Sequence, residues 1–492
     1  MNEIKKKMAK GAAWLVLFRL TERSIGIIST LILARVLVPT DFGLVAMATS
    51  MLAALELLGA FSFDLALIQN QQAQRHHYDT AWTFGVCFGV FKALALCALA
   101  IPAAIFFSEP RLELLIYALA VVTLLEGFVN IGIVAFQKDL ELHKEFWLGI
   151  SKKLAGFCVT VTLALLFRSY WALMAGILAT RLVGLALSYR LHPFRPRLSM
   201  TGAADLFNFS KWLLLNNFLI FLNNRGTDLV IGRLSGAREL GLYSVAYEIS
   251  NLPTTELVWP ISRAVFPGYA RMAHDLPQLR SAFVQVIGLV ALITVPAGVA
   301  IALLAGSIVQ VLLGPKWADA VPLIQVLAIF GVVRSLHGPT GSIYLALGKP
   351  HFIAWLQCVQ LVVAIGSMVV LLPRLGLIGA GYALLAGAVT ATVVSYCMVL
   401  WDLKLAAFIL ARTLWRPVVG AVAMTATVHY AHPYKFNEST FGGQLTNFLM
   451  LGGMAALSYF ITVGLCWLSV RKPDGAEALI VRFGLGNIGK SA

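Results

Sequence analysis

A stripe of charged and small residues runs along the first apolar segment of the chain. Arg19, Glu22, Arg23, Gly26 and Thr30 are three or four residues apart, so a helix would place them on one face. Guanidinium groups stay charged and can grip a phosphate through two parallel hydrogen bonds. The two arginines therefore predict binding of an anion such as a phosphate or a carboxylate, and Glu22 can pair with Arg19.

Other apolar segments also carry ionisable or amide side chains. A charge at the centre of a bilayer costs several kcal/mol, from about 2.5 to more than 10, so such residues face a protein interior or water. We predict that the cationic ones line a substrate cavity and that the acidic and amide ones form a coupling or gating site. The predicted substrate-binding residues are Arg19, Arg23, Arg181, Arg225 and Arg334. The predicted coupling or gating residues are Glu22, Glu126, Asp228, Glu248, Glu256, Asn217 and Asn224.

Some of these side chains have simpler interpretations. Arg225 and Asp228 are spaced as an ion pair that serves only to lock helices together. Glu56 and Lys92 can pair locally or extend towards the membrane surface. His337 is more often a buried, hydrogen-bonded histidine than a proton relay.

The acidic residues suggest how transport is driven. Buried carboxylates suit a proton cycle, whereas the oxygens of Asn217, Asn224 and Asp228, at i, i+7 and i+11, suit Na⁺. We therefore expect H⁺ or Na⁺ as the coupling ion, with no other cofactor, no metal site and no catalytic residues.

The composition indicates whether these residues belong to a soluble protein or to a membrane protein. Of 492 residues, 59% are hydrophobic and 12% are charged, against roughly 45–50% and about 25% in soluble domains. This excludes a soluble globular enzyme, a disordered chain and a fibrous protein. We predict an all-α polytopic membrane protein.

The net charge of +15 has an ordinary explanation in such a protein. Cytoplasmic loops of membrane proteins carry surplus Lys and Arg, and the chain has no zinc knuckle or RNA-binding signature, so we expect no nucleic-acid partner. None of the six cysteines forms a CxxC pair. Because all six lie in apolar segments, we expect free thiols without disulfides.

Hydropathy predicts fourteen membrane-spanning helices. A span needs about 20 mostly apolar residues, and short connections with turn residues separate the candidates. The expected spans cover 11–37, 42–66, 80–107, 112–136, 146–167, 170–190, 211–235, 240–266, 281–305, 320–346, 352–372, 376–401, 417–431 and 444–468. The tenth is expected to kink at Gly338-Pro339.

Charge asymmetry predicts the orientation. The N-terminus imitates a signal peptide, but Arg19, Glu22 and Arg23 interrupt its apolar run and no cleavage site follows, so we expect a retained first span. With the N-terminus inside, about three times as many Lys and Arg residues fall on the cytoplasmic side as on the outer side. Both termini are therefore expected in the cytoplasm.

The two halves of the chain resemble each other. Trp14 aligns with Trp212, Arg35 with Arg233 and Gly43 with Gly241. A later alignment pairs Trp147 with Trp355 and, at opposite charge, Glu126 with Arg334. We therefore predict an N-lobe of six helices at 1–205, a C-lobe of six helices at 206–405, and two further helices with a cytoplasmic tail at 406–492.

An even number of spans per half makes the two repeats parallel. Such repeats are a transporter architecture in which two halves rock about a site near the membrane midplane. The polar residues concentrate in the first two helices of each half, which predicts a central cavity. The arginine-rich cavity favours an anionic substrate, and Glu126 is a candidate release partner for Arg334.

Several motifs resemble the polysaccharide transporter family, the Wzx-type oligosaccharide flippases of the multidrug/oligosaccharidyl-lipid/polysaccharide exporter superfamily. The resemblance covers about residues 10 to 400 and is greatest to the colanic-acid-type and succinoglycan-type branch. The similar stretches are Leu33-Ala34-Arg35 with Pro39-Thr40-Asp41-Phe42-Gly43, Leu240-Gly241-Leu242-Tyr243-Ser244-Val245-Ala246-Tyr247, Arg263 to Arg271, Gly314-Pro315-Lys316-Trp317, and Arg334 with Gly338-Pro339-Thr340-Gly341-Ser342.

The resemblance implies a flippase that moves undecaprenyl-diphosphate-linked oligosaccharide repeat units across a bacterial inner membrane by alternating access. It also implies two six-helix bundles plus two helices. The alternatives are a drug or toxin cation antiporter of the same superfamily, which the arginines disfavour, and a membrane enzyme of polysaccharide assembly, which should carry a large outer loop. Expected partners are the lipid-linked oligosaccharide, membrane lipids and the polysaccharide polymerase or export machinery, and the expected state is a monomer.

Overall fold

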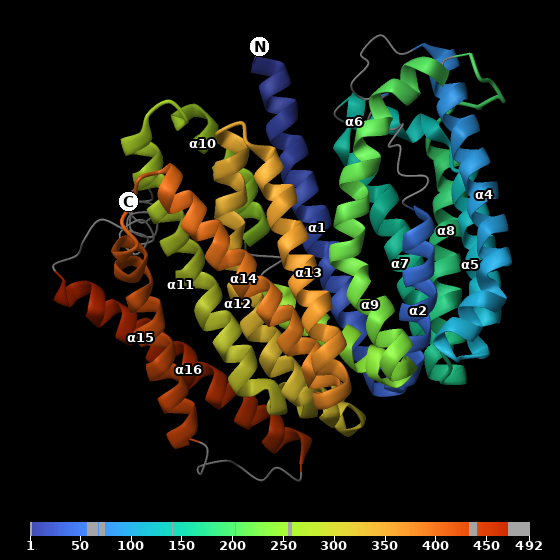
Figure 1. Ribbon diagram of the computed structural model, residues 1–492. Coiled ribbons are helices and arrows are strands. Elements are labelled where there is room, and N and C mark those ends of the chain that lie inside the picture. Colours follow the sequence, from blue (N-terminus) through green and yellow to red (C-terminus); the bar gives the residue numbers. More distant parts are fainter. Residues whose placement is uncertain are drawn as a thin grey trace, which may run out of the picture. The chain divides into compact units, whose positions relative to one another are not determined.

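The computed structural model describes residues 2–56, 67, 74–139, 141–201, 203–253, 258–431 and 440–470, although some side chains at helix ends are not described. Every regular element in these ranges is a helix (Figure 1). The chain forms two compact units, Met1–Ser244 and Val245–Ala492. The boundary between them lies inside one long helix, α9 (Ala203–Pro253). The predicted lobe boundaries at 205 and 405 stay predictions.

The first unit is a bundle in which consecutive helices pack as pairs. α4 packs on α5, α7 packs on α8, and α1 packs on α7. Its elements are α1 (Asn2–Val36), α2 (Pro39–Glu56), α4 (Arg75–Phe107), α5 (Arg111–Gly127), η2 (Ile131–Val134), α6 (Ala135–Lys138), α7 (Leu142–Phe167), α8 (Trp171–Leu191) and the first part of α9.

The second unit is also helical. α12 contacts α11 and α14, α13 pairs with α14, and α15 pairs with α16. Its elements are the end of α9, α10 (Trp259–Met272), α11 (Leu276–Ile308), η4 (Val309–Leu313), η5 (Pro315–Ala320), α12 (Val321–Ala346), α13 (Pro350–Leu375), α14 (Leu377–Asp402), α15 (Phe408–Ala431) and α16 (Phe441–Ser469). The helix α12 continues through Pro339 without an interruption.

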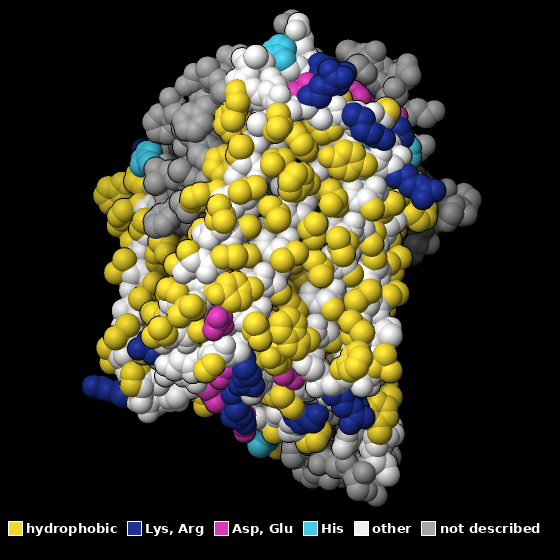
Figure 2. Space-filling model, turned by 90° about the vertical axis from the view of Figure 1, so that its right-hand side faces the viewer, with side chains coloured by type: hydrophobic (Ala, Val, Ile, Leu, Met, Phe, Trp, Pro, Cys, Tyr) yellow, Lys and Arg dark blue, Asp and Glu magenta, His cyan; other side chains and the backbone are white. Residues whose placement is uncertain are grey.

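The helices are those of a multi-pass membrane protein. Within the described ranges, eight helices are long and apolar enough to cross a membrane, or nine if one bent pair counts as a span. Viewed from the side of α4, α5 and α8, a broad hydrophobic band covers the surface, and Lys and Arg side chains gather towards its two ends (Figure 2). Side chains such as Ile105 and Leu94 are 73% and 66% exposed. A water-soluble protein rarely exposes so continuous an apolar surface, so this band faces lipid.

Small residues allow the paired helices to approach closely. A Cβ atom added to Gly89 on α4 would lie 2.9 Å from the Cα atom of Gly127 on α5. On the next pair, added Cβ atoms at Gly156 and Gly176 would collide with the hydroxyls of Thr180 and Thr160. Small residues at such crossings are typical of membrane helices, which associate through close packing and not through the hydrophobic effect.

A reciprocal glycine contact joins α2 to α9 within the first unit. A side chain at Gly43 would collide with the carbonyl oxygen of Ala237, and one at Gly241 would collide with the carbonyl oxygen of Pro39. Pro39 and Ala237 are separated by the same number of residues as the two glycines. The contact therefore joins two stretches that the predicted repeat makes equivalent. Nearby, Gly236 interrupts α9 with a φ of 84°, a backbone conformation that favours glycine.

The fourth expected span is not one straight helix. α5 ends at Gly127, and η2 with α6 continues at an angle of 68°. The cause is Asn130, which is fully buried and accepts a hydrogen bond from the Gly132 amide. The backbone amide of Asn130 donates to Ser188 Oγ at 3.1 Å. An asparagine that bonds locally to the backbone competes with helix continuation, so the prediction of a continuous helix over 112–136 is wrong at its end.

Candidate functional site

An ion pair between α5 and α8 forms the centre of the candidate site. Arg181 Nη1 donates to Glu126 Oε1 at 2.6 Å, and both side chains are about one third exposed. The second carboxylate oxygen, Glu126 Oε2, is buried and has no hydrogen-bond partner in the described part of the chain. The sequence predicted both residues as site members, and the structure brings them into contact. Glu126 thus already has a cationic partner in its own unit.

Further charges from neighbouring helices surround this pair. Glu56 is close enough to interact electrostatically with Glu126, Lys92, Arg181 and Arg225. Lys152 interacts in the same way with Arg181, Glu126, Glu145 and Glu22. Seven helices of the first unit therefore supply charged side chains to a group that we call the first-unit charge cluster. Its members are Glu22, Glu56, Lys92, Glu126, Glu145, Lys152, Arg181 and Arg225.

Lys152 and Lys153 lie inside α7, although the predicted orientation counts them with the cytoplasmic charges. Lys153 Nζ lies 4.0 Å from the position that a Cβ atom of Gly26 on α1 would occupy. The stem of Lys152 crosses Gly184 on α8, where an added Cβ atom would lie 2.8 Å from its Cδ atom. Glycine at both positions leaves room for a long cationic side chain. Both lysines fall inside the expected span at 146–167, and this position could have identified them as candidate site residues.

Only part of the charged stripe on α1 is buried in the first unit. Glu22 and Arg23 are half-buried, and the Arg23 Nε atom is fully buried, whereas Arg19 is exposed. The preceding turns pack on α7, because Phe18 and Trp14 both contact Phe146, with ring centroids 6.4 and 4.9 Å apart. The structure therefore separates Arg19 from the half-buried members of its stripe.

Asp228 is tied to two partners. Arg225 Nη1 donates to Asp228 Oδ2 at 3.0 Å, and the Ser50 hydroxyl of α2 donates to the same oxygen at 3.3 Å. Asp228 is only 6% exposed. This geometry agrees with the simpler interpretation of the pair, in which Asp228 holds α9 to α2, and leaves the Arg225 side chain partly exposed beside the cluster.

Arg334 and Glu248 belong to the second unit. Arg334 Nη1 donates to the hydroxyl of Tyr247 at 2.6 Å, and the Tyr247 ring packs against Phe330. On the same helix, His337 Nδ1 is buried without a hydrogen-bond partner among the described residues, so this histidine is not the fully hydrogen-bonded one expected. The predicted convergence of Arg334 with the arginines of the first half stays a prediction.

Three predicted coupling residues lie outside what is described. Glu256 falls in an undescribed segment, and the side chains of Asn217 and Asn224 on α9 are not described. The six cysteines are free thiols. Where side chains are described, no three His, Cys, Asp or Glu residues gather as metal ligands would.

The segment after α8 is held against the end of the first unit. The amide of Arg197 donates to Asp79 Oδ1 at 2.9 Å, and the amide of Ser199 donates to Thr83 Oγ1 at 2.9 Å. Asn130 Nδ2 donates to the carbonyl oxygen of Phe194 at 2.7 Å. Because buried side chains bind its backbone, the segment from His192 to Thr201, which we call the linker, is docked against the first unit.

One of these linker contacts should depend on pH. Burial and the charge of Lys144 lower the pKa of His192, and its Nδ1 accepts the Phe194 amide at 3.2 Å. A neutral imidazole is thus favoured, so its contribution to stability is complete above the usual histidine pKa of about 6.5 and is lost as the pH falls below it. We expect amides 194–199 to exchange faster at about pH 5.5 than at about pH 7.5, after correction for intrinsic rates.

Hydrogen exchange followed by mass spectrometry tests this expectation. The nearby charges that His192 meets are Lys144 and Arg195, which oppose its protonation, and Asp139 and Glu141, which favour it. The variant His192→Asn keeps an acceptor that does not titrate, so its linker protection should not change with pH. Equal protection of the wild-type linker at both pH values would contradict the role of His192.

Comparison with known proteins places this fold and sequence. Residues 32–322 match the family model described as "Polysaccharide biosynthesis protein". The chain is 25% identical over 401 residues to the lipopolysaccharide biosynthesis protein WzxC of Escherichia coli (strain K12), covering 80% of this chain and 81% of that one. It is 26% identical over 330 residues to the succinoglycan biosynthesis transport protein ExoT of Rhizobium meliloti (strain 1021), covering 66% of each.

A solved structure shares the fold. The lipid II flippase MurJ, in its inward closed conformation, superposes with a TM-score of 0.74 over 92% of this chain and 99% of that chain, at 12% sequence identity. At this identity the likeness concerns the fold alone. The sequence resemblance to the polysaccharide transporter family is confirmed by the family match and the relatives.

Proposed function

Because the chain belongs to the polysaccharide biosynthesis protein family, we propose that it is a flippase for lipid-linked oligosaccharide repeat units. It moves undecaprenyl-diphosphate-linked units from the cytoplasmic to the periplasmic leaflet of a bacterial inner membrane. The product serves exopolysaccharide, capsule or O-antigen synthesis. The relative that is named as a transport protein supports transport over catalysis.

The first-unit charge cluster is the observation that carries this proposal. Together with the neighbouring Arg23, Lys153 and Asp228, it sets six basic side chains against five acidic ones inside membrane helices. A surplus of positive charge inside membrane helices is costly, so an anionic ligand would stabilise the cluster. A diphosphate headgroup supplies the missing negative charge, and arginine binds it through parallel hydrogen bonds.

The architecture of the proposal is two parallel six-helix lobes with two further helices, fourteen spans in all, and both termini in the cytoplasm. In the described ranges, helices cover most of the expected spans, with the fourth bent after Gly127. The reciprocal contact of Gly43 and Gly241 supports the repeat. Gly43 meets the carbonyl oxygen of Ala237, and Gly241 meets that of Pro39, the residue that the repeat makes equivalent to Ala237.

Release of the substrate requires another partner for the cations. Glu126 is suited to this role because its bond to Arg181 competes directly with a phosphate oxygen. In the proposed cycle the ion pair opens when the headgroup binds and reforms when the headgroup leaves. The contact with Arg181 supports this role, and the predicted pairing of Glu126 with Arg334 stays a prediction.

An ion gradient is the proposed energy source. The candidate residues for the coupling ion, H⁺ or Na⁺, are Glu22, Glu126 and Asp228 in the first unit and, separately, Glu248 in the second. The open Glu126 Oε2 atom offers a position for the ion. We expect flipping in vesicles to fall when both gradients are collapsed, and the variant Glu126→Gln to be insensitive to that treatment. Unchanged wild-type flipping without either gradient would remove the coupling site from the scheme.

The proposed partners are the lipid-linked oligosaccharide, the surrounding lipids and the polymerase or export machinery of the same pathway, with the protein acting as a monomer. A deletion strain tests the function in the cell. We expect the lipid-linked glycan to accumulate on the cytoplasmic face and the surface polysaccharide to disappear. Normal surface polysaccharide together with new sensitivity to cationic drugs would instead identify a cation antiporter.

A further inference from the structure

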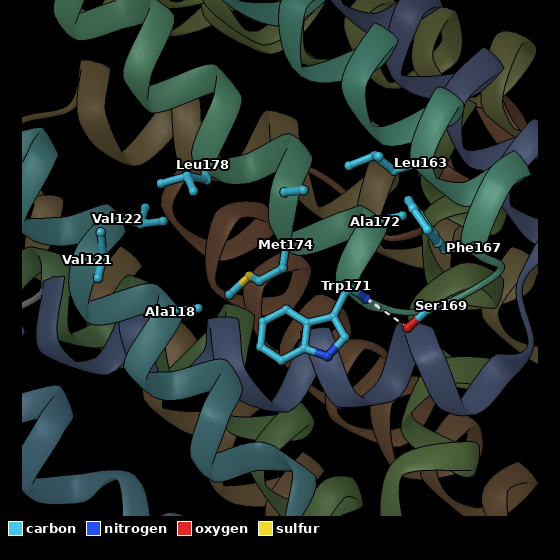
Figure 3. Close-up of a pocket in the computed structure, with 11 residues that line it drawn as sticks. Ala118, Val121, Val122, Leu163, Phe167, Ser169, Trp171, Ala172, Met174 and Leu178 are labelled. Atoms are coloured by element: carbon cyan, nitrogen blue, oxygen red, sulfur yellow. Dashed lines mark hydrogen bonds between the residues drawn. The ribbon is translucent and has the colours of Figure 1, made fainter.

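A hydrophobic groove opens on the first unit between α5, α7 and α8 (Figure 3). Its volume is about 650 Å³, which lies within the range of about 300–1,000 Å³ for small-molecule sites. Val121 of α5 lines one wall, Phe167 of α7 lines the opposite wall, and Trp171, Met174 and Leu178 of α8 lie between them. The groove is thus built by three helices whose mutual packing is described.

The groove faces the hydrocarbon of the bilayer. Phe167 is 70% exposed, Val121 is 51% exposed and Trp171 is 40% exposed, although all three are hydrophobic. Ser169 supplies the one hydroxyl of the lining. No member of the first-unit charge cluster lines it, so its occupant need not pass through the proposed transport site. An apolar lining that opens to lipid calls for a hydrocarbon chain.

The depth of the groove matches one leaflet. From Trp171 to Leu178 the helix rises by about 10 Å, at about 1.5 Å per residue. Half of the hydrocarbon core is about 15 Å thick. A chain lying along α8 would therefore have its headgroup at the turn between α7 and α8. Tyr170 and Trp171 stand at this turn, and such aromatic residues are common at the membrane surface.

The mouth of the groove carries an uncompensated positive charge. Arg168 lies between the lining residues Phe167 and Ser169, is exposed, and takes the left-handed conformation that ends α7, with a φ of 49°. Its guanidinium makes no hydrogen bond or ion pair with any part of the chain that the structure describes. The neighbouring Arg111 differs, because its Nε and Nη2 atoms both donate to the Glu109 carboxylate, at 3.1 and 3.0 Å.

Two further features favour an anion at the same place. The helix α8 begins beside Arg168, and its N-terminus carries a partial positive charge. The Ser169 hydroxyl oxygen accepts the Trp171 amide at 3.4 Å, which leaves its O–H free to donate. The apolar groove and its cationic mouth are therefore complementary to an amphiphile with a hydrocarbon chain and a negatively charged head.

We propose that this groove binds one anionic phospholipid of the adjacent leaflet, with an acyl chain along α8 and the phosphate at Arg168 and Ser169. The site is separate from the proposed transport function and does not depend on it. A bound lipid would fill the space between α5 and α8, the two helices that the Arg181–Glu126 ion pair also joins. It would thereby hold their spacing on the lipid side of the bundle.

Native mass spectrometry of the full-length protein with added phosphatidylglycerol or phosphatidylcholine tests the proposal. We expect the wild type to retain phosphatidylglycerol about tenfold better, because the choline cation of phosphatidylcholine offsets the phosphate charge and repels Arg168, whereas phosphatidylglycerol keeps its net negative charge. Arg168→Asn should remove this preference, and asparagine tolerates the left-handed backbone. Arg111→Asn is the matched control and should keep it. Ala175→Phe fills the groove and should reduce retention of both lipids.

Melting temperatures confirm that each variant is folded before lipid retention is compared. An unchanged headgroup preference in Arg168→Asn, or equal loss in Arg111→Asn, would overturn the proposal. Competition with undecaprenyl monophosphate separates the two sources of a lipid phosphate. If this polyprenyl lipid displaced phosphatidylglycerol from the wild type at equal concentration, the groove would belong to the polyprenyl chain and the proposed occupant would be wrong.

Discussion

The substitution Gly43→Val is expected to destabilise the protein strongly and to abolish flipping. A Cβ atom at this position collides with the Ala237 carbonyl oxygen, which belongs to a helical backbone and cannot rotate away. Either α2 and α9 separate, or both helices bend. Overpacking of this kind costs about 1–3 kcal/mol even where side chains can adjust. The readouts are thermal unfolding of the purified protein in detergent and flipping in vesicles.

The reciprocal glycine provides an internal check. Gly241→Val should have a similar effect, because its side chain would collide with the Pro39 carbonyl oxygen in the same contact. Once one valine has separated the helices, the second meets less resistance, so the double variant should cost less than the sum of the singles. Gly306→Ala is the control, since nothing lies within 4 Å of its added Cβ atom. Fully additive effects would contradict the shared contact.

Breaking the Arg181–Glu126 ion pair from its two sides should have opposite effects on substrate binding. Arg181→Gln removes a phosphate ligand and leaves Glu126 without the partner seen at 2.6 Å. We expect affinity for the lipid-linked oligosaccharide to fall by about 10- to 100-fold, the worth of one charged hydrogen bond. Glu126→Gln frees Arg181 for the phosphate, so binding should strengthen while turnover falls.

Binding and flipping must be measured side by side to see this difference. The Arg111–Glu109 pair at the other end of α5 is the matched control, because Arg111→Gln also breaks an arginine–carboxylate pair of the first unit. It should leave both quantities unchanged. Weaker binding in Glu126→Gln would show that the carboxylate holds the substrate and does not compete with it.

The apolar elements of this fold were predictable because a bilayer imposes length and composition on its helices. The same argument could not place the break at Asn130, which depends on Ser188 and Phe194 from distant parts of the chain. Nor did it predict the close approach of Gly43 to Ala237. Residue spacing determines which face of a helix a side chain occupies but not which helix it meets.

The candidate site could likewise be predicted from the sequence only in part. Arg181 and Glu126 stood out because each is a charge in an apolar segment, and the structure pairs them. Lys152 and Lys153 lie near the start of their segment, so counting charges by side placed them in the cytoplasm. Their position inside α7 follows from where that helix begins, at Leu142. Arg19 shares the spacing of its stripe yet is exposed, because the rotation of α1 depends on its packing against α7.

Flipping of a lipid-linked oligosaccharide by the purified protein in vesicles tests the central claim most directly. The probe is an undecaprenyl-diphosphate oligosaccharide, and its appearance in the opposite leaflet is scored with an impermeant glycan-modifying enzyme. We predict flipping that requires the protein and is lost in Arg181→Gln but kept in Arg111→Gln. Flipping that proceeds equally well in Arg181→Gln, or none in the folded wild type under an imposed ion gradient, would contradict the account.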